Sequence, residues 1–463
     1  MDISFNLKIF SHTRKITIQK EWIRFAVVLT TVLASTVIAY WGSTRIMMMV
    51  LALLVGIAGI LVLLNLPNLV YILILLGGIF IPFTGPSNTN AAVLFVALLI
   101  GLWIVDMLII KRRIQFISSR ALLPVLVFLV ISVIAFGMGQ ISWFTFARQA
   151  PLTAQAGEFA IFVLSLGTLL VTAHVLRDLV WLKIIFWTFM GLGVIYVIGR
   201  AIRFSLIDRF YSLGFTAGSM FWTWFVALAL SQAIFNYQMR REIRIALFGI
   251  VLVTFYVAYV QANDWKSGWV PPFVVAAALI GLRYKRLTVF AIPVGMIIAV
   301  FLANKLVATD EYSWGTRLDA WKIVLEISRV SPLLGLGFSN YYWYTPLFPI
   351  RGWHVSFNSH SQYVDLIAQV GIAGLLCFLW VFYEVGKLCW NLVEQIDDGF
   401  PKAYLFGVIA GIAGTLMAAS LVDWVLPFVY NIGFNGFRAS ILPWIFLGGA
   451  VSIEQIYKRR TEN

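Results

Sequence analysis

The chain has 463 residues, of which 61% are hydrophobic and 12% are charged, and its net charge is +14. A soluble domain carries about twice this charged fraction, so composition excludes an ordinary soluble protein. The apolar residues fall in long runs, each of the length that crosses about 30 Å of hydrocarbon. The basic residues are scattered between these runs, which indicates membrane topology and argues against nucleic-acid binding.

The apolar runs predict an all-α, polytopic membrane protein with about fourteen transmembrane helices. The first 24 residues are polar and basic, and no small-residue cleavage site follows them, which predicts an uncleaved signal anchor. The predicted spans are residues 25–42, 46–64, 69–84, 91–110, 121–138, 159–176, 184–199, 219–236, 245–262, 269–282, 287–303, 371–390, 403–420 and 439–456.

Basic residues cluster beside alternate span ends, for example at 111–113, 240–244 and 458–460. Because Lys and Arg flank membrane spans mainly on the cytoplasmic side, this pattern predicts a bacterial inner-membrane protein with both termini in the cytoplasm.

The predicted organisation has five parts. These are a cytoplasmic segment (1–24), a transmembrane bundle (25–303), a large periplasmic loop (304–370), C-terminal transmembrane helices (371–456) and a cytoplasmic tail (457–463). Long ordered loops on a rigid scaffold often carry function, so the chemistry is expected in the periplasmic loop.

Two helices are predicted inside that loop. The first begins at Thr316, with Asp319 in the position of a capping-box acid, and ends before Pro332. Arg317 then lies in its first turn, near backbone N–H groups that favour anions. The second helix begins near His360 and runs toward Gly371.

The predicted outer face is rich in arginine. Arg317, Arg329 and Arg351 lie in the long loop, and Arg200, Arg203 and Arg209 share an earlier outer loop. A guanidinium fork suits phosphate oxygens, and a lipid diphosphate at the membrane edge is the natural partner. The alternative for any one arginine is contact with lipid headgroups or a surface ion pair.

Two of the four histidines, His354 and His360, lie in the long loop. Histidine can accept a proton from a hydroxyl near neutral pH. Four histidines spread over both membrane faces do not form a histidine-rich metal site, and the chain contains no Asp-x-Asp pattern. Arginine is therefore the expected source of positive charge for a diphosphate leaving group.

The sequence around His360 is more specific. His360-Ser361 is followed by nine residues and then by Gly371-Ile372-Ala373-Gly374. This spacing resembles the H-[NSQ]-x9-G-x-x-G signature of the O-antigen ligase family and of related O-antigen polymerases. Segments 316–321 and 331–338 are also similar to the shared outer region of that family, and the resemblance covers roughly residues 310–385.

The resemblance implies an inverting glycosyltransferase that needs no metal or other cofactor and acts in lipopolysaccharide or polysaccharide biosynthesis. Its donor is an undecaprenyl-diphosphate-linked glycan, and its acceptor is lipid A-core for a ligase or a lipid-linked glycan for a polymerase. By position, His360 is the implied catalytic base and Arg317 one of two diphosphate-binding arginines. Arg209 fits the second best, with Arg203 and Arg200 as alternatives.

A transporter or flippase for a lipid-linked or anionic substrate is the main alternative of another class. Ion-coupled transporters place ionisable groups in the middle of the membrane. No such group is predicted here, because Asp106 and Glu384 fall near the basic inner-end residues Lys111 and Lys387. Asp319 and Asp365 are interpreted as structural residues, and the loop aromatics as an interfacial belt.

Overall fold

The computed structural model describes residues 62–81, 88–211, 213–216, 218–261, 266–284 and 311–462, apart from single residues within or beside these ranges. These residues form helices and no β-sheet; their one β-bridge joins Ile350 and Trp353. The chain divides into two compact units, residues 1–70 with 101–115, and residues 71–100 with 116–463. The candidate site lies entirely in the second unit.

Ten α-helices lie within the described residues up to residue 283. They are α3 (Leu69–Phe80), α4 (Ala91–Val105), α5 (Leu123–Met138), α6 (Leu152–Val175), α7 (Leu179–Ala201), α8 (Ile207–Phe210), α9 (Leu213–Thr216), α10 (Ser219–Phe235), α11 (Arg241–Tyr256) and α12 (Lys266–Arg283). Two π-helical turns, Asp106–Ile110 and Val257–Gln261, extend α4 and α11. The second half has α14 (Glu311–Ser328), α15 (Asn340–Tyr344), α16 (Gln362–Gln395), α17 (Phe400–Leu421) and α18 (Gly433–Glu462).

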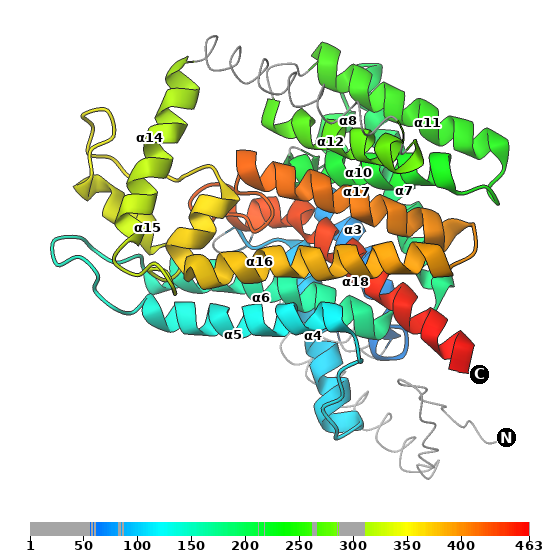
Figure 1. Cartoon of the computed structure of the whole chain (residues 1–463), viewed down its shortest axis with the longest axis horizontal. Coiled ribbons are helices and arrows are strands. Elements are labelled where there is room, and N and C mark those ends of the chain that lie inside the picture. The colour runs from blue at the N-terminus through cyan, green and yellow to red at the C-terminus, as the bar shows by residue number, and fades with distance from the viewer. Residues whose placement is uncertain are drawn as a thin grey trace, which may run out of the picture. The chain divides into compact units, whose positions relative to one another are not determined.

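The long helices pack side by side within the second unit. In Figure 1, α5, α6 and α16 run alongside one another, and α10, α12 and α17 form a second packed group. The apolar window of α18 is wholly buried because it packs against α6 and other helices. Small residues allow this approach: Gly448 lies against Thr172, and Gly449 against Tyr404.

Among the described residues, seven helices are long and apolar enough to cross a membrane, which supports a membrane-embedded helical protein. They span Ala91–Ile110, Arg120–Met138, Leu152–Val175, Leu179–Ala201, Gln362–Gln395, Phe400–Leu421 and Gly433–Arg459, and the shorter apolar helices are Leu69–Phe80, Ser219–Phe235 and Ser267–Arg283. The predicted spans at 25–42 and 287–303, and nearly all of 46–64, lie outside the described residues. The total of fourteen spans remains a prediction.

The predicted start of the first loop helix is wrong. Helix α14 begins at Glu311, so Thr316 lies inside it and cannot cap it. The segment before Thr316 contains no proline, and the one glycine there, Gly315, lowers helix stability by only about 1 kcal/mol. Arg317 therefore lies in the second turn, away from the free N–H groups that the sequence pattern placed beside it.

Candidate functional site

Arg317 is held between its own helix and the end of α17. Its Nη1 donates a hydrogen bond to the carbonyl of Leu421, the last residue of α17, at 3.1 Å. Its guanidinium carbon lies 5.5 Å from the centre of the Trp314 ring, one turn earlier on α14. The side chain is half-buried. The aromatic face and the carbonyl fix the position of the guanidinium.

His360 lies within electrostatic range of Arg317 and directly before Ser361, the residue that precedes α16. Burial lowers the pKa of the imidazole below 6.5, and the positive charge of Arg317 lowers it further. The ring is therefore neutral near pH 7, and one of its nitrogens has a free lone pair. A neutral, partly buried imidazole beside a guanidinium can accept a proton from a hydroxyl group.

The backbone at His360 is strained, with φ of +51°, which is uncommon for a residue other than glycine. The neighbouring Ser359 holds it in place. The Ser359 carbonyl accepts a hydrogen bond from Trp321 Nε1 at 2.7 Å, and the Ser359 hydroxyl donates to Asp365 Oδ1 at 2.7 Å. Tyr341 also donates to Asp365 Oδ1, at 2.5 Å. Among the described residues, both of these bonds go to Oδ1 of Asp365, and its Oδ2 is buried without a hydrogen-bond partner. The interpretation of Asp365 as a structural residue remains a prediction.

Gly371 breaks α16 eleven residues after His360. Its φ of 72° and ψ of −177° lie in a region that is essentially restricted to glycine. A Cβ on Gly371 would collide with the backbone of Leu333. The kink exposes backbone groups that the loop after α14 satisfies: Leu336 N–H donates to Ala368 O at 2.8 Å, and Ile372 N–H donates to Pro332 O at 2.9 Å.

The spacing between His360 and Gly371 therefore has a structural meaning. It sets the length of the short helical segment that joins the histidine to the kink, and the kink fixes this segment against the loop at 331–337. Two further glycines with positive φ, Gly335 and Gly337, allow the close contacts: a Cβ on Gly335 would meet the backbone of Gln369, and one on Gly337 the backbone of Gly139.

Asp423 is a residue at the site that the sequence analysis missed. It follows α17, is fully buried, and accepts hydrogen bonds from Asn431 Nδ2 at 2.7 Å and Asn358 Nδ2 at 3.3 Å. Burial raises the pKa of its carboxyl to about 6, against the opposing effects of these amides and of Arg317. Its one sequence signal is an acid in an outer segment, 421–438, that is longer than a minimal turn.

Asp319 and Arg351 form an ion pair at the edge of the site. Arg351 Nε lies 3.0 Å from Asp319 Oδ2, and both side chains are about one-third exposed. The Arg351 guanidinium passes over Gly315, where a Cβ would collide with it. Arg351 therefore holds the loop around residue 351 against α14. Asp319 provides the acidic partner of this ion pair and does not cap a helix.

The structure does not place the predicted second arginine beside His360. Arg200 forms a 3.0 Å ion pair with Asp208, and Arg203 and Arg209 are exposed on the segment after α7 and on α8. Arg317 is the charged residue that acts on the pKa of His360. Arg317 thus acts electrostatically on His360, while the diphosphate-binding role of Arg317 and that of Arg209, Arg203 or Arg200 remain predictions.

No ionisable group is predicted in the middle of a span, and the structure adds one buried carboxyl group in the second turn of an apolar helix. Glu158 lies inside the long apolar helix α6 and is fully buried. One carboxylate oxygen accepts the Val429 N–H at 2.6 Å, and the other is 3.5 Å from Gln369 Nε2. The helix begins at Leu152, so it contains Glu158, which the predicted span at 159–176 excluded. Asp106 pairs with Lys111 at 2.6 Å, and its position near the membrane interface remains a prediction.

No group of three or more His, Cys, Asp or Glu side chains suited to a metal ion occurs within the described ranges. The sequence matches no protein-family model, and no curated protein matches it significantly. The fold thus defines a helical, membrane-embedded protein, and its function is argued from the site.

Proposed function

We propose that the protein is an inverting glycosyltransferase that moves a glycan from an undecaprenyl-diphosphate carrier to an acceptor hydroxyl at the periplasmic face of the bacterial inner membrane. One observation carries the proposal: a neutral imidazole, His360, lies within the electrostatic range of a positioned guanidinium, Arg317. These two groups match the two charges that such a transfer develops, a proton leaving the acceptor and a negative diphosphate leaving the donor.

In the proposed reaction, His360 takes the proton of the acceptor hydroxyl as its oxygen attacks the anomeric carbon. The new C–O bond forms while the bond from that carbon to the diphosphate breaks, and the diphosphate departs with the electron pair. Attack from the face opposite the leaving group inverts the configuration. Arg317 stabilises the negative charge on the departing oxygens, and a second arginine, Arg209 by preference, is proposed to share this role without a metal.

The acceptor that we propose is lipid A-core, as in an O-antigen ligase. A polymerase that extends lipid-linked repeat units would share the donor and the base and would differ only in the acceptor. The preference for a ligase rests on the His360–Gly371 spacing.

A transporter remains the alternative from another class, because one observation favours it. The fully buried Glu158 in α6 is the kind of intramembrane carboxyl that proton-coupled transporters use. Its bonds to Val429 and Gln369 give it a structural role in the glycosyltransferase account. In proteoliposomes, substrate uptake that requires a proton gradient and is lost in Glu158→Gln would favour the transporter.

The direct test uses purified protein in detergent with a lipid-linked glycan donor and a chelator. Lipid A-core and a second lipid-linked unit are offered as acceptors in separate reactions. We expect glycan transfer to lipid A-core with the chelator present. Transfer only to the lipid-linked unit would identify a polymerase, and no transfer to either acceptor by well-folded protein would contradict the proposed function.

A further inference from the structure

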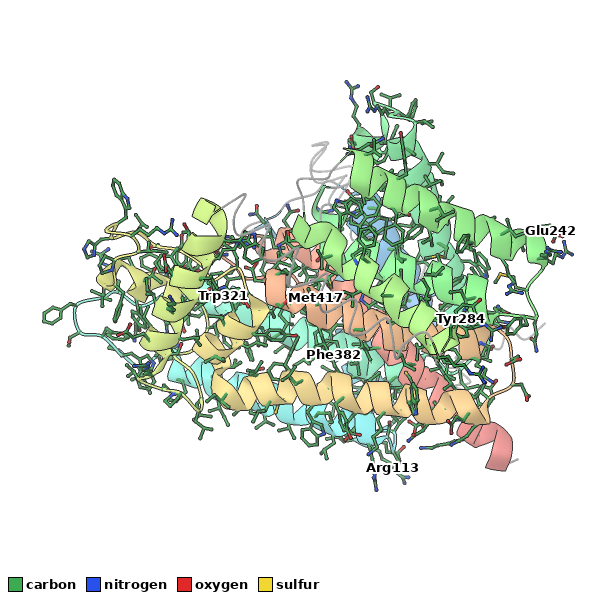
Figure 2. All side chains as sticks on the ribbon, turned by 45° about the horizontal axis from the view of Figure 1, so that its top comes forward. Arg113, Glu242, Tyr284, Trp321, Phe382 and Met417 are labelled. Carbon is green, nitrogen blue, oxygen red and sulfur yellow. The ribbon has the colours of Figure 1, made fainter. Side chains whose placement is uncertain are left out.

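A cavity lined by basic and aromatic residues lies far from the candidate site. It has a volume of about 680 Å³ and is lined by the C-terminal ends of α10 and α12 with the residues after them, and by the start of α17 with a residue before it. Figure 2 shows Tyr284, which lines this cavity, toward one end of the helices and Trp321 of the candidate site toward the other.

Positive charge dominates the cavity. Arg283, Arg286 and Lys402 line it together with one acid, Asp398. Lys402 pairs with Asp398 at 3.0 Å, which neutralises both charges. Arg283 and Arg286 are left without an ion pair in the described part of the chain. The cavity therefore presents two uncompensated guanidinium groups.

Aromatic rings hold one of these guanidinium groups in place. The Arg283 guanidinium lies 5.6 Å from the ring centre of Tyr237 and 5.8 Å from that of Tyr284. Across the described residues, its N–H groups donate to no other protein atom. Arg244 also lies over Tyr237, at 4.9 Å, but its guanidinium is occupied by the carbonyls of Ala233 and Ile234. Arg283 is therefore oriented and still has its donor fork available for an anion.

The wall of the cavity is apolar. Phe235 and Phe406 stack with ring centres 4.1 Å apart, and Leu282 lies beside them. A guanidinium pair next to an aromatic wall suits a molecule that has a phosphate at one end and hydrocarbon at the other.

The helix α17 gives the position of the cavity relative to the candidate site. Lys402 is in its first turn, and Leu421, which binds Arg317, is its last residue. At 1.5 Å per residue the two ends are about 30 Å apart, which is the thickness of the hydrocarbon core. The cavity therefore belongs to the opposite membrane surface from Arg317 and His360.

We propose that this cavity binds the phosphate headgroup of an anionic phospholipid in the leaflet opposite the candidate site, with Arg283 and Arg286 as the phosphate ligands. Basic pockets between transmembrane helices bind anionic headgroups in this way. The proposal does not depend on the glycosyltransferase activity.

The test measures binding of short-chain phosphatidylglycerol to the full-length protein in neutral detergent, by the rise in thermal unfolding temperature and by native mass spectrometry. Phosphatidylcholine and inorganic phosphate are tested in separate experiments. The first shows whether a zwitterionic lipid also binds, and the second shows whether a free anion is sufficient. The variant is Arg283→Gln/Arg286→Gln. The matched control is Arg240→Gln/Arg241→Gln, which removes the same charge from two exposed residues outside the cavity.

We expect phosphatidylglycerol to bind the protein and the control equally, and the variant about tenfold more weakly, as the loss of charge-assisted hydrogen bonds predicts. If the control variant loses as much phosphatidylglycerol binding as the cavity variant, general surface charge explains the binding and the proposal is overturned. Equal binding of phosphatidylcholine, or binding of inorganic phosphate alone, would overturn the anionic lipid as the ligand. Should the double variant fold poorly, Arg283→Gln alone provides the same comparison against Arg241→Gln.

Discussion

His360 combines two properties that each require a cause. Its backbone lies in the left-handed region, with φ of +51°, and the pKa of its side chain is lowered by burial and by Arg317. Strained residues persist where the surrounding structure fixes them, and they cluster at functional sites. The bonds of Ser359 to Trp321 and Asp365 are that fixing structure, and the result is an imidazole that stays neutral near a positive charge.

The lowered pKa of His360 predicts the pH dependence of transfer. A base works only when it is unprotonated, so activity should be retained above the folded pKa and fall as the pH drops through it, at a value below 6.5. Replacing Arg317 with Gln removes a positive charge, so the midpoint of the remaining activity should move to higher pH. Initial rates of transfer between pH 4.5 and 8 measure both midpoints.

Asp423 titrates nearby, with a pKa of about 6, and its effect can be separated. The variant Asp423→Asn cannot titrate. If His360 causes the loss of transfer activity at low pH, this variant should still lose activity as the pH drops. If the variant keeps its activity at low pH, the loss in the wild type is due to Asp423.

Arg317 should not be replaceable by lysine. Lysine retains the charge but not the planar fork that can hold both Leu421 O and a phosphate oxygen. We expect Arg317→Lys to lower the transfer rate about a hundredfold, the scale seen when one donor to a developing negative charge is lost. The control is Arg351→Lys, because Arg351 pairs with Asp319 at the edge of the site. Similar rates for the two variants would count against a specific role of Arg317.

At the scale of elements, the kink at Gly371 divides α16 into a short segment that begins after His360 and a long apolar span. The loop at 331–337 locks the kink through backbone hydrogen bonds. This junction makes the position of His360 depend on the packing of a membrane helix, so the site is built on a rigid element and not on a free loop.

Substitution of Gly371 tests this junction. Gly371→Ala introduces a Cβ into an essentially glycine-only conformation and against Leu333, so we expect a loss of stability of about 3 kcal/mol. Gly386→Ala, later in α16, is the control, because its Cβ would make an ordinary contact with Ile412 at 3.6 Å. The unfolding temperature in detergent should fall clearly for Gly371→Ala only. An unchanged unfolding temperature for this variant would show that the kink does not require glycine.

The sequence predicts some of these elements better than others. Apolar runs locate the long helices because burial in lipid demands that composition. The second loop helix, expected to begin near His360, begins at Gln362, but the kink at Gly371 was not predicted. Local rules placed the start of α14 at Thr316, whereas the helix begins at Glu311. Asp423 and Glu158 were missed because their partners, such as Asn358 and Val429, are distant in sequence. Contacts of this kind depend on tertiary packing, which no local pattern records.

At the scale of the whole molecule, topology decides which surface carries the site. The predicted orientation places residues 304–370 outside and the basic segment before α11 inside. Val355 is exposed in the loop, and Glu242 is exposed in the first turn of α11, directly after the basic segment. The native cysteines, Cys377 and Cys389, are buried. In intact spheroplasts, a membrane-impermeant maleimide should label Val355→Cys and should label Glu242→Cys only after lysis. The reverse pattern would place the site in the cytoplasm.

The central claim is that His360 takes the acceptor proton, and the most direct measurement is single-turnover glycan transfer by purified His360→Ala with a lipid-linked donor. The control is His354→Ala, the other loop histidine, whose exposed ring contacts the Pro346 carbonyl. We expect His360→Ala to fold and to bind the donor but to transfer no glycan, and we expect His354→Ala to retain wild-type transfer. Wild-type transfer by His360→Ala would contradict the claim.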